Sequence, residues 1–238
     1  MTFEELIIKH GAASFDKQIY LQAMFGKAGW SLDLSTGVLA FRKPHEEPQQ
    51  LFVQVLGTQS EDSGTWLWAW ANQAQSFAPA LLGVAEEVRA LGAELGVAEL
   101  AQAEIPCTSQ VNGESIAAVA SGLCRAGCTF RAAYPRGAMQ LLIRDPRFKR
   151  PVSQPAPRIV RVFPMFLRAN PEIPARPALL AYLQFYRLNV EEQGERVRAW
   201  SAGESRNAIG AEAARALVAE FDGAGRLLRI EEDWSTPA

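Results

Sequence analysis

Three tryptophans at alternate positions constrain the fold of this chain more than any other feature. Trp66, Trp68 and Trp70 lie within residues 65–72 and make up half of the 6 tryptophans in the sequence. Because side chains on a β-strand repeat every two residues, this spacing predicts a strand whose three indoles share one face. So large an apolar surface must pack against a helix, a second sheet or a ligand.

The segment after this tryptophan ladder offers a partner for it. Apolar residues from Leu81 to Leu95 repeat with steps of three and four residues, which predicts an amphipathic helix that Gly96 ends. If this helix packs across the strand, the indoles belong to the core. In the alternative interpretation the indoles line a pocket for a flat ligand, and Asn72 either supplies a polar group there or closes the following turn.

The remaining patterns predict an α+β fold. Residues 3–25 are predicted as a helix interrupted near Gly11, and residues 113–126 as a second helix. Alternating apolar residues predict strands at 30–34, 38–42, 51–57, 128–133 and 138–143. Hairpins outnumber strand–helix–strand crossovers, so we predict a mainly antiparallel sheet with helices packed on one face.

Four prolines between residues 146 and 157 divide the chain. Proline at this density disfavours both a helix and a central strand, so residues 146–157 are predicted to link two sub-parts. Residues 1–145 then form an α+β domain with the tryptophan strand, and residues 158–238 form a smaller α+β part. Within the smaller part we predict a strand at 158–166, a helix at 177–190 and a hairpin at 217–230.

The composition is that of a folded protein without a strong net charge. Hydrophobic residues make up 48% of the chain, the net charge is −2 and the pI is near 5.8. This balance argues against non-specific binding of the whole chain to nucleic acids or membranes. The sequence contains neither the roughly 18-residue apolar run of a membrane span nor a signal peptide, so we expect a cytoplasmic protein.

No pattern in the sequence points to a catalytic or metal centre. The histidines, His10 and His45, are far apart, and Cys107, Cys124 and Cys128 form no Cys-x-x-Cys pair. Phosphate-binding loops, dinucleotide fingerprints and nucleophile elbows are absent from the sequence. We predict no cofactor and no bound metal, and the sequence favours a protein that is not an enzyme.

A surface rich in arginine is predicted in the smaller part. On a strand, Arg196, Arg198 and Trp200 would share one face, and arginine beside an aromatic ring is a composition enriched at protein interfaces. The alternative is an ordinary solvated sheet face. Nucleic-acid binding through the basic residues between 147 and 150 is a weaker hypothesis, which requires an affinity that falls steeply with salt.

Three motifs of the first part follow one another in a recognisable order. They are WLWAWAN at residues 66–72, the apolar repeat from Leu81 to Leu95, and AGCTFR at residues 126–131. With these motifs, residues 29–145 resemble a family of uncharacterised bacterial proteins, a domain of unknown function. The resemblance implies a bacterial cytoplasmic α+β domain and implies no activity, and the part after the prolines lies outside it.

Together these patterns predict a non-catalytic cytoplasmic protein that binds another protein, such as an accessory or immunity-like factor. The arginine and tryptophan surface of the smaller part is the predicted contact. The alternative is a small-molecule-binding protein, or an unrecognised enzyme, with a pocket beside Trp66, Trp68 and Trp70. No membrane partner is predicted.

Overall fold

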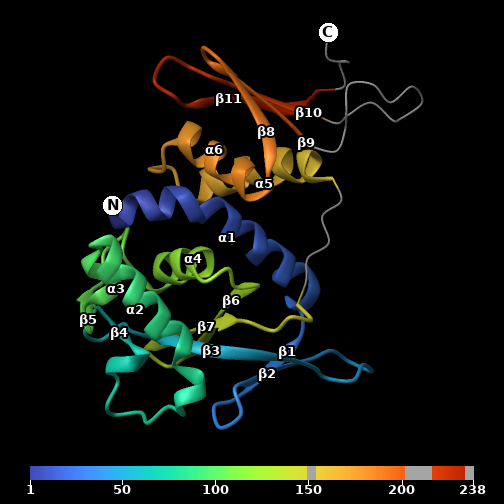
Figure 1. The fold of residues 1–238 in the computed structure, drawn as a ribbon. Coiled ribbons are helices and arrows are strands. Elements are labelled where there is room, and N and C mark those ends of the chain that lie inside the picture. Colours follow the sequence, from blue (N-terminus) through green and yellow to red (C-terminus); the bar gives the residue numbers. More distant parts are fainter. Residues whose placement is uncertain (149–153, 202–215, 234–238) are drawn as a thin grey trace. The chain divides into compact units, whose positions relative to one another are not determined.

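The chain divides into two compact units, Met1–Arg150 and Pro151–Ala238. A computed structural model describes residues 1–148, 154–201 and 216–233 (Figure 1). Both units combine helices with antiparallel strands, so the predicted α+β class is confirmed. Each unit is considered separately below.

The first unit is built on a 7-stranded sheet whose pairings are all antiparallel. Its strands are β1 (Gly29–Asp33), β2 (Val38–Arg42), β3 (Gln49–Ser60), β4 (Thr65–Trp68), β5 (Glu104–Pro106), β6 (Cys128–Tyr134) and β7 (Gly137–Ile143). The longest strand, β3, pairs with β2 through its first residues, with β4 through its last residues and with β7 over most of its length. All seven residues of β7 are buried, so this strand lies at the centre of the unit.

Helical segments of the first unit pack against this sheet (Figure 1). They are α1 (Phe3–Phe25), η1 (Ala69–Ala71), η2 (Pro79–Leu81), α2 (Gly83–Leu95), α3 (Ala98–Ala101) and α4 (Gly113–Leu123). Two glutamines of β3 fix where helices begin. Gln54 Oε1 accepts a hydrogen bond from the N–H of Val84 in the first turn of α2 (2.8 Å), and Gln59 Oε1 accepts one from Gly113 at the start of α4 (2.7 Å). A β-bulge after Val55 keeps the two glutamines on one face of the sheet.

Helix α1 packs on the same face. Gln18 Nε2 donates to the backbone oxygen of Thr129 on β6 (2.9 Å), and both Thr129 and Gln54 pair in register with Leu142. The starts of α2 and α4 and the part of α1 around Gln18 therefore attach to one face of the sheet, as predicted.

The predicted interruption of the first helix near Gly11 is wrong. Helix α1 continues through Gly11 because this residue and the small residues that follow, Ala12 to Ser14, are all buried, and α1 packs against α4. The helix begins instead at a capping box, in which Thr2 accepts from the N–H of Glu5 and Glu5 accepts from the N–H of Thr2.

On the opposite face the sheet curls, and aromatic rings bridge strands that are not paired. Trp30 of β1 meets the edge of Phe130 of β6 at 5.2 Å, and Phe130 meets Phe41 of β2 at 5.4 Å. Phe25, the last residue of α1, stacks on Phe41 at 4.2 Å. These rings fill the concave side of the curl.

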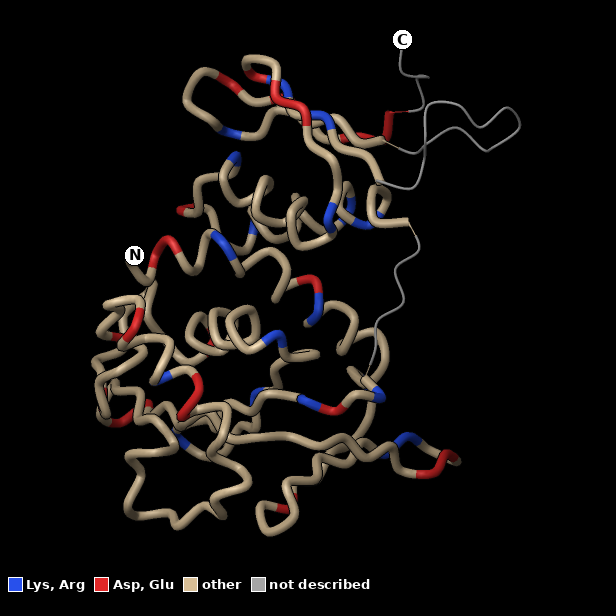
Figure 2. The backbone as a smooth tube through the Cα atoms, in the orientation of Figure 1, with Lys and Arg blue, Asp and Glu red and all other residues tan. Residues whose placement is uncertain are grey.

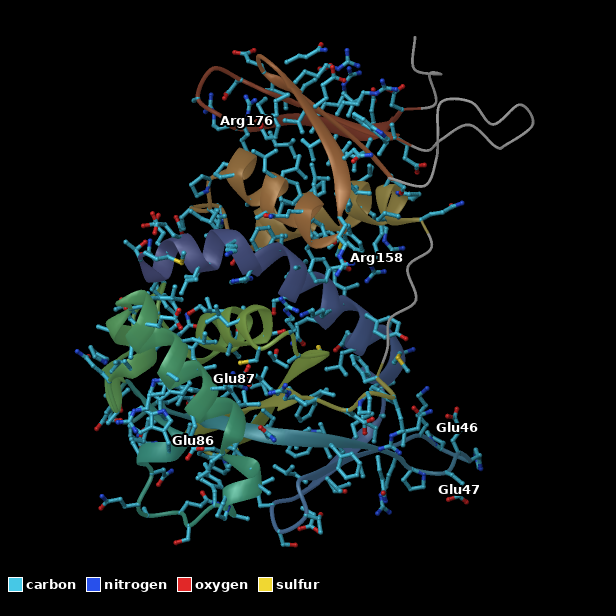
Figure 3. All side chains as sticks on the ribbon, in the orientation of Figure 1. Glu46, Glu47, Glu86, Glu87, Arg158 and Arg176 are labelled. Carbon is cyan, nitrogen blue, oxygen red and sulfur yellow. The ribbon has the colours of Figure 1, made fainter. Side chains whose placement is uncertain are left out.

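In its described residues, the second unit has two helices and a 4-stranded antiparallel sheet with the order β11-β10-β9-β8. Its elements are α5 (Pro155–Ala169), α6 (Ala175–Phe185), β8 (Leu188–Gln193), β9 (Arg196–Ser201), β10 (Ala216–Phe221) and β11 (Leu227–Asp233). Helix α5 packs against β9, β10 and β11, and α6 packs against β8. Arg176 of α6 (Figure 3) fixes this layer, because its guanidinium donates to the Glu192 carboxylate at 2.8 Å and to the Gly194 carbonyl at 2.7 Å.

The predicted strand at 158–166 is wrong, because these residues lie within α5. The prolines at 155 and 157 occupy the first turn, where the backbone N–H has no helical partner to lose. Ile159, Val162 and Phe166 then recur at helical spacing and are buried. Residues 155–157, which we assigned to the linker, therefore belong to the helix, and residues 149–153 of that linker lie outside the described residues.

Candidate functional site

The tryptophan ladder is divided between a strand and a helical turn. Trp66 and Trp68 lie on β4, have no exposed surface and meet edge to face at 5.4 Å. Trp68 Nε1 donates to the Glu99 carbonyl at 3.1 Å. The strand ends at Trp68, so the prediction that Trp70 continues it is wrong. Trp70 lies in η1, is half-buried, and has the guanidinium of Arg89 4.2 Å from its ring centroid.

The two strand tryptophans belong to the core of the first unit. The core also contains Val84 and Val88 of the predicted helix, and the start of α4 lies against Trp66 at Gly113. A ligand could reach these indoles only if the core opened. Of the three rings of the predicted pocket, only Trp70 is left to contact a ligand. Arg89 already lies over one face of that ring.

Asn72 closes the turn that follows η1. Its Oδ1 accepts a hydrogen bond from the N–H of Gln75 at 3.1 Å, which is the local bond that asparagine commonly makes at turns. This bond engages the amide oxygen of Asn72 and supports the alternative prediction that this residue closes the turn.

Arg196, Arg198 and Trp200 share one face of β9, as their spacing predicts. They pair with Gln193, Glu191 and Asn189 on β8, respectively. This face is opposite to the one that carries the buried residues Val197 and Ala199. We call it the outer face of the second unit.

The strands of the second unit carry residues of both charges (Figure 2), and ion pairs form on the outer face. Arg198 Nε lies 3.2 Å from the Asp233 carboxylate, and Arg229 lies 2.9 Å from Glu220 and 3.3 Å from Glu231. The hydrogen bond from Arg229 to Glu220 raises the pKa of the guanidinium further. Glu231 and Asp233, at the end of the last strand, are thus partners of arginines, and the arginines do not form an uncompensated basic patch.

The cysteines lie in positions that suit structural thiols. Burial raises the pKa of both Cys124 and Cys128 to about 12, and the half-buried Cys107 also has a raised pKa because of burial. Cys124 ends α4 and Cys128 begins β6, so the two do not lie on one helix. Among the described residues, no three His, Cys, Asp or Glu side chains are grouped so as to hold a metal ion.

Sequence reasoning missed one buried ionic arrangement, centred on Asp145 just after β7. Its carboxylate accepts from the N–H of Phe52 at 3.0 Å and from Arg147 Nε at 2.9 Å. The bond from Arg147 is the main cause that lowers the pKa of Asp145. Arg147 also donates to the Gln50 carbonyl at 2.9 Å. This arginine, which we considered for nucleic-acid binding, therefore ties β7 to β3, and Lys149 and Arg150 lie outside the described residues.

His10 packs against the backbone of α4 at Gly122, where a Cβ atom would come within 2.2 Å of the imidazole. Its Nε2 has no hydrogen-bond partner among the described residues. Burial, with smaller contributions from Lys9 and Lys17, lowers the pKa of His10 to about 4. The folded unit therefore holds this side chain neutral at pH 7.

The depressed pKa of His10 predicts a loss of stability in mild acid. The unfolded chain takes up a proton near pH 6.5 and the folded chain only near pH 4, so the contribution is complete above pH 6.5 and declines as the pH falls toward 4. Between pH 7 and pH 4.5 we expect the free energy of unfolding to fall by about 2 kcal/mol more in the wild type than in His10→Gln. Urea denaturation at both pH values measures this difference, and parallel pH profiles would contradict the assignment.

Comparisons with known proteins place the first unit in a family. In the part of the chain that the structure describes, no helix has the length and apolar character needed to cross a membrane. Neither a comparison with curated proteins nor one with solved structures found a match. One family, described as a family of unknown function, matches residues 4–146. The match confirms the resemblance inferred for residues 29–145 and extends it over α1, and the chain therefore belongs to this family of unknown function, DUF6882.

Proposed function

We propose that this chain is a non-catalytic protein that binds another protein through the outer face of its second unit. The observation that carries the proposal is the placement of Arg196, Arg198 and Trp200 on a single sheet face, with Trp200 half-exposed. Arginine and tryptophan are the residue types that most often dominate binding energy at protein interfaces. We further propose that the protein is bacterial and cytoplasmic, and that it acts as an accessory or immunity-like factor.

The charge pattern of the outer face favours a protein partner of mixed charge. Basic and acidic side chains are mixed on the strands of this face, and several already form ion pairs within it. A polyanion such as nucleic acid would meet the acidic residues of the face as well as the arginines. A protein that presents both signs can instead match each strand in turn, which is how charged groups give an interface its specificity.

The alternative, a small ligand beside the tryptophan ladder, receives less support. Two of its three rings are enclosed by the core, and the third carries Arg89 on its face. Binding on the ring face that Arg89 covers would require Arg89 to move aside.

The proposal predicts that one partner depends on Trp200. We expect the purified full chain, immobilised as bait, to retain a stoichiometric partner from a bacterial lysate. Trp200→Ala is expected to weaken that complex about 30-fold, because truncating a central aromatic residue typically costs about 2 kcal/mol or more. Arg196→Glu is expected to slow association and to change its salt dependence.

Arg42→Glu is a suitable matched control. Arg42 is an exposed arginine at the end of β2, in the first unit, so its charge reversal should leave the complex intact. Isothermal titration with the identified partner measures the affinities of the wild type and the three variants, and stopped-flow mixing measures the association rate of Arg196→Glu. Capture of no partner, or equal affinities for the wild type and both outer-face variants, would overturn the proposal.

A further inference from the structure

The four-stranded sheet of the second unit has two edges of different character. Among the described residues, β8 pairs only with β9, and β11 pairs only with β10. An unpaired strand edge presents backbone donors and acceptors to any strand that can lie beside it, unless its side chains prevent the approach. The side chains of β8 and β11 differ in this respect.

The β8 edge opposes pairing with another copy of itself. Its charged residues are Glu191 and Glu192, and it carries no basic residue. An antiparallel pair of β8 strands would bring these carboxylates close together, and like charges placed across a strand pair are destabilising.

The β11 edge, in contrast, is complementary to itself. Arg229 and Glu231 flank Ile230 symmetrically. In an antiparallel pair of β11 strands with its twofold axis beside Ile230, each Arg229 lies opposite Glu231 of the second copy. The two side chains are 54% and 51% exposed, so the contact across the axis can form beside the ion pairs that Arg229 makes with Glu220 and Glu231 of its own copy. Leu228, the extra residue at the bulge of this strand, is 67% exposed and would lie opposite Glu232 of the second copy, so the complementarity rests on Arg229 and Glu231.

The backbone direction of β11 also permits the pairing. On β10, the N–H of Phe221 donates to the Glu195 carbonyl, on the side of β9. Because successive residues of a strand turn their backbone groups to opposite sides, Glu220 faces β11, where it pairs with Arg229. It follows that the backbone N–H and C=O groups of Arg229 and Glu231 point toward β10. Ile230 turns its N–H and C=O to the open edge. There the N–H of each Ile230 can donate to the C=O of Ile230 in the second copy.

We infer that two copies of this chain associate by antiparallel pairing of their β11 strands, which creates one continuous sheet across a twofold axis. Symmetric, isologous contacts of this kind are the commonest route to a dimer, and strand addition supplies the backbone bonds. A two-strand contact buries little surface, so the dimer should be weak and dependent on concentration. The outer faces of both copies stay exposed, so this inference does not rest on the proposed partner binding.

Charge reversal provides a sharp test with the full chain. Sedimentation equilibrium from about 1 to about 200 µM should show a monomer–dimer equilibrium for the wild type. Arg229→Glu and Glu231→Arg should each raise the dimer Kd by about tenfold or more, because each change acts twice across the axis. An equimolar mixture of the two variants should dimerise again, since one copy then presents two carboxylates at these positions and the other copy presents two guanidinium groups opposite them.

Two further variants separate pairing from folding. Ile230→Pro removes the outward N–H and should abolish the dimer while the circular dichroism spectrum is retained. Asn189→Asp, on the other edge, adds an acidic side chain to a strand that already opposes pairing and should leave the dimer unchanged. The inference is overturned if the wild type is monomeric over the whole range, if the single variants dimerise as the wild type does, or if their mixture shows no recovery. Trp200→Ala should not affect the dimer, so failure of this inference is distinct from failure of the proposed function.

Discussion

Trp66→Ala is expected to lower the free energy of unfolding by about 4 kcal/mol, the largest effect of any single truncation we propose. The indole has no exposed surface, packs edge to face with Trp68 and lies against Gly57 of β3 and Gly113 of α4. Its removal leaves a cavity between the sheet and α4 that the surrounding backbone cannot close. Urea denaturation followed by far-ultraviolet circular dichroism measures the loss without relying on tryptophan emission.

Trp70→Ala is the matched control within the same motif. Trp70 is half-buried and lies in η1, outside the strand, so its truncation should cost only about 1 kcal/mol. Acrylamide should quench the emission of Trp70 and should not reach Trp66 or Trp68. Similar stability losses for the two variants would show that the ladder is not core, and the interpretation of the ladder as a binding site would regain its support.

The ladder shows how far a periodic pattern can define a strand. The period of two correctly predicts a strand through Trp68 with Trp66 and Trp68 on one face, and it fails at Trp70. Pairing determines the difference, because β5 pairs only with residues Thr65 to Leu67 and β3 only as far as Trp68. Beyond Trp68 the strand pairing with β3 does not continue, and the backbone forms the helical turn η1. A sequence pattern gives the side-chain face but does not reveal where the partner strands end.

The second unit shows a different cause of error. Residues 158–166 contain β-branched residues that favour a strand, and the nearby prolines suggest a break. The helix forms nevertheless, because the prolines lie in its first turn and the apolar residues pack under the sheet. By contrast, the shared face of Arg196, Arg198 and Trp200 follows from local spacing alone. The ion pair between Arg198 and Asp233 was not predictable, because it depends on the register of strands distant in sequence.

At Gly57, β3 packs very closely against the tryptophan strand β4. It lies opposite Trp68 in the strand pair. A Cβ atom at this position would be 2.5 Å from the Leu67 carbonyl oxygen and 2.5 Å from Cζ2 of Trp66. The first neighbour is backbone of the paired strand, and the second is a fully buried ring. Neither can yield without displacing β4, so the absence of a side chain at this position is what allows Trp66 to lie flat against β3.

Gly57→Ala is therefore expected to destabilise the first unit by about 3 kcal/mol although it adds only one methyl group, because overpacking against a rigid neighbour is not relieved by rotamer changes. Gly83→Ala is the matched control. A Cβ at Gly83 would meet only the side-chain amide of Gln54, at ordinary contact distances of 3.5 Å to Oε1 and 3.8 Å to Nε2, and Gly83 lies in the first turn of α2. We expect this control to stabilise the unit by about 0.5 kcal/mol through a less flexible unfolded chain. Thermal and urea unfolding of the two alanine variants should thus shift in opposite directions, and a tolerated Gly57→Ala would show that Trp66 does not pack directly on β3.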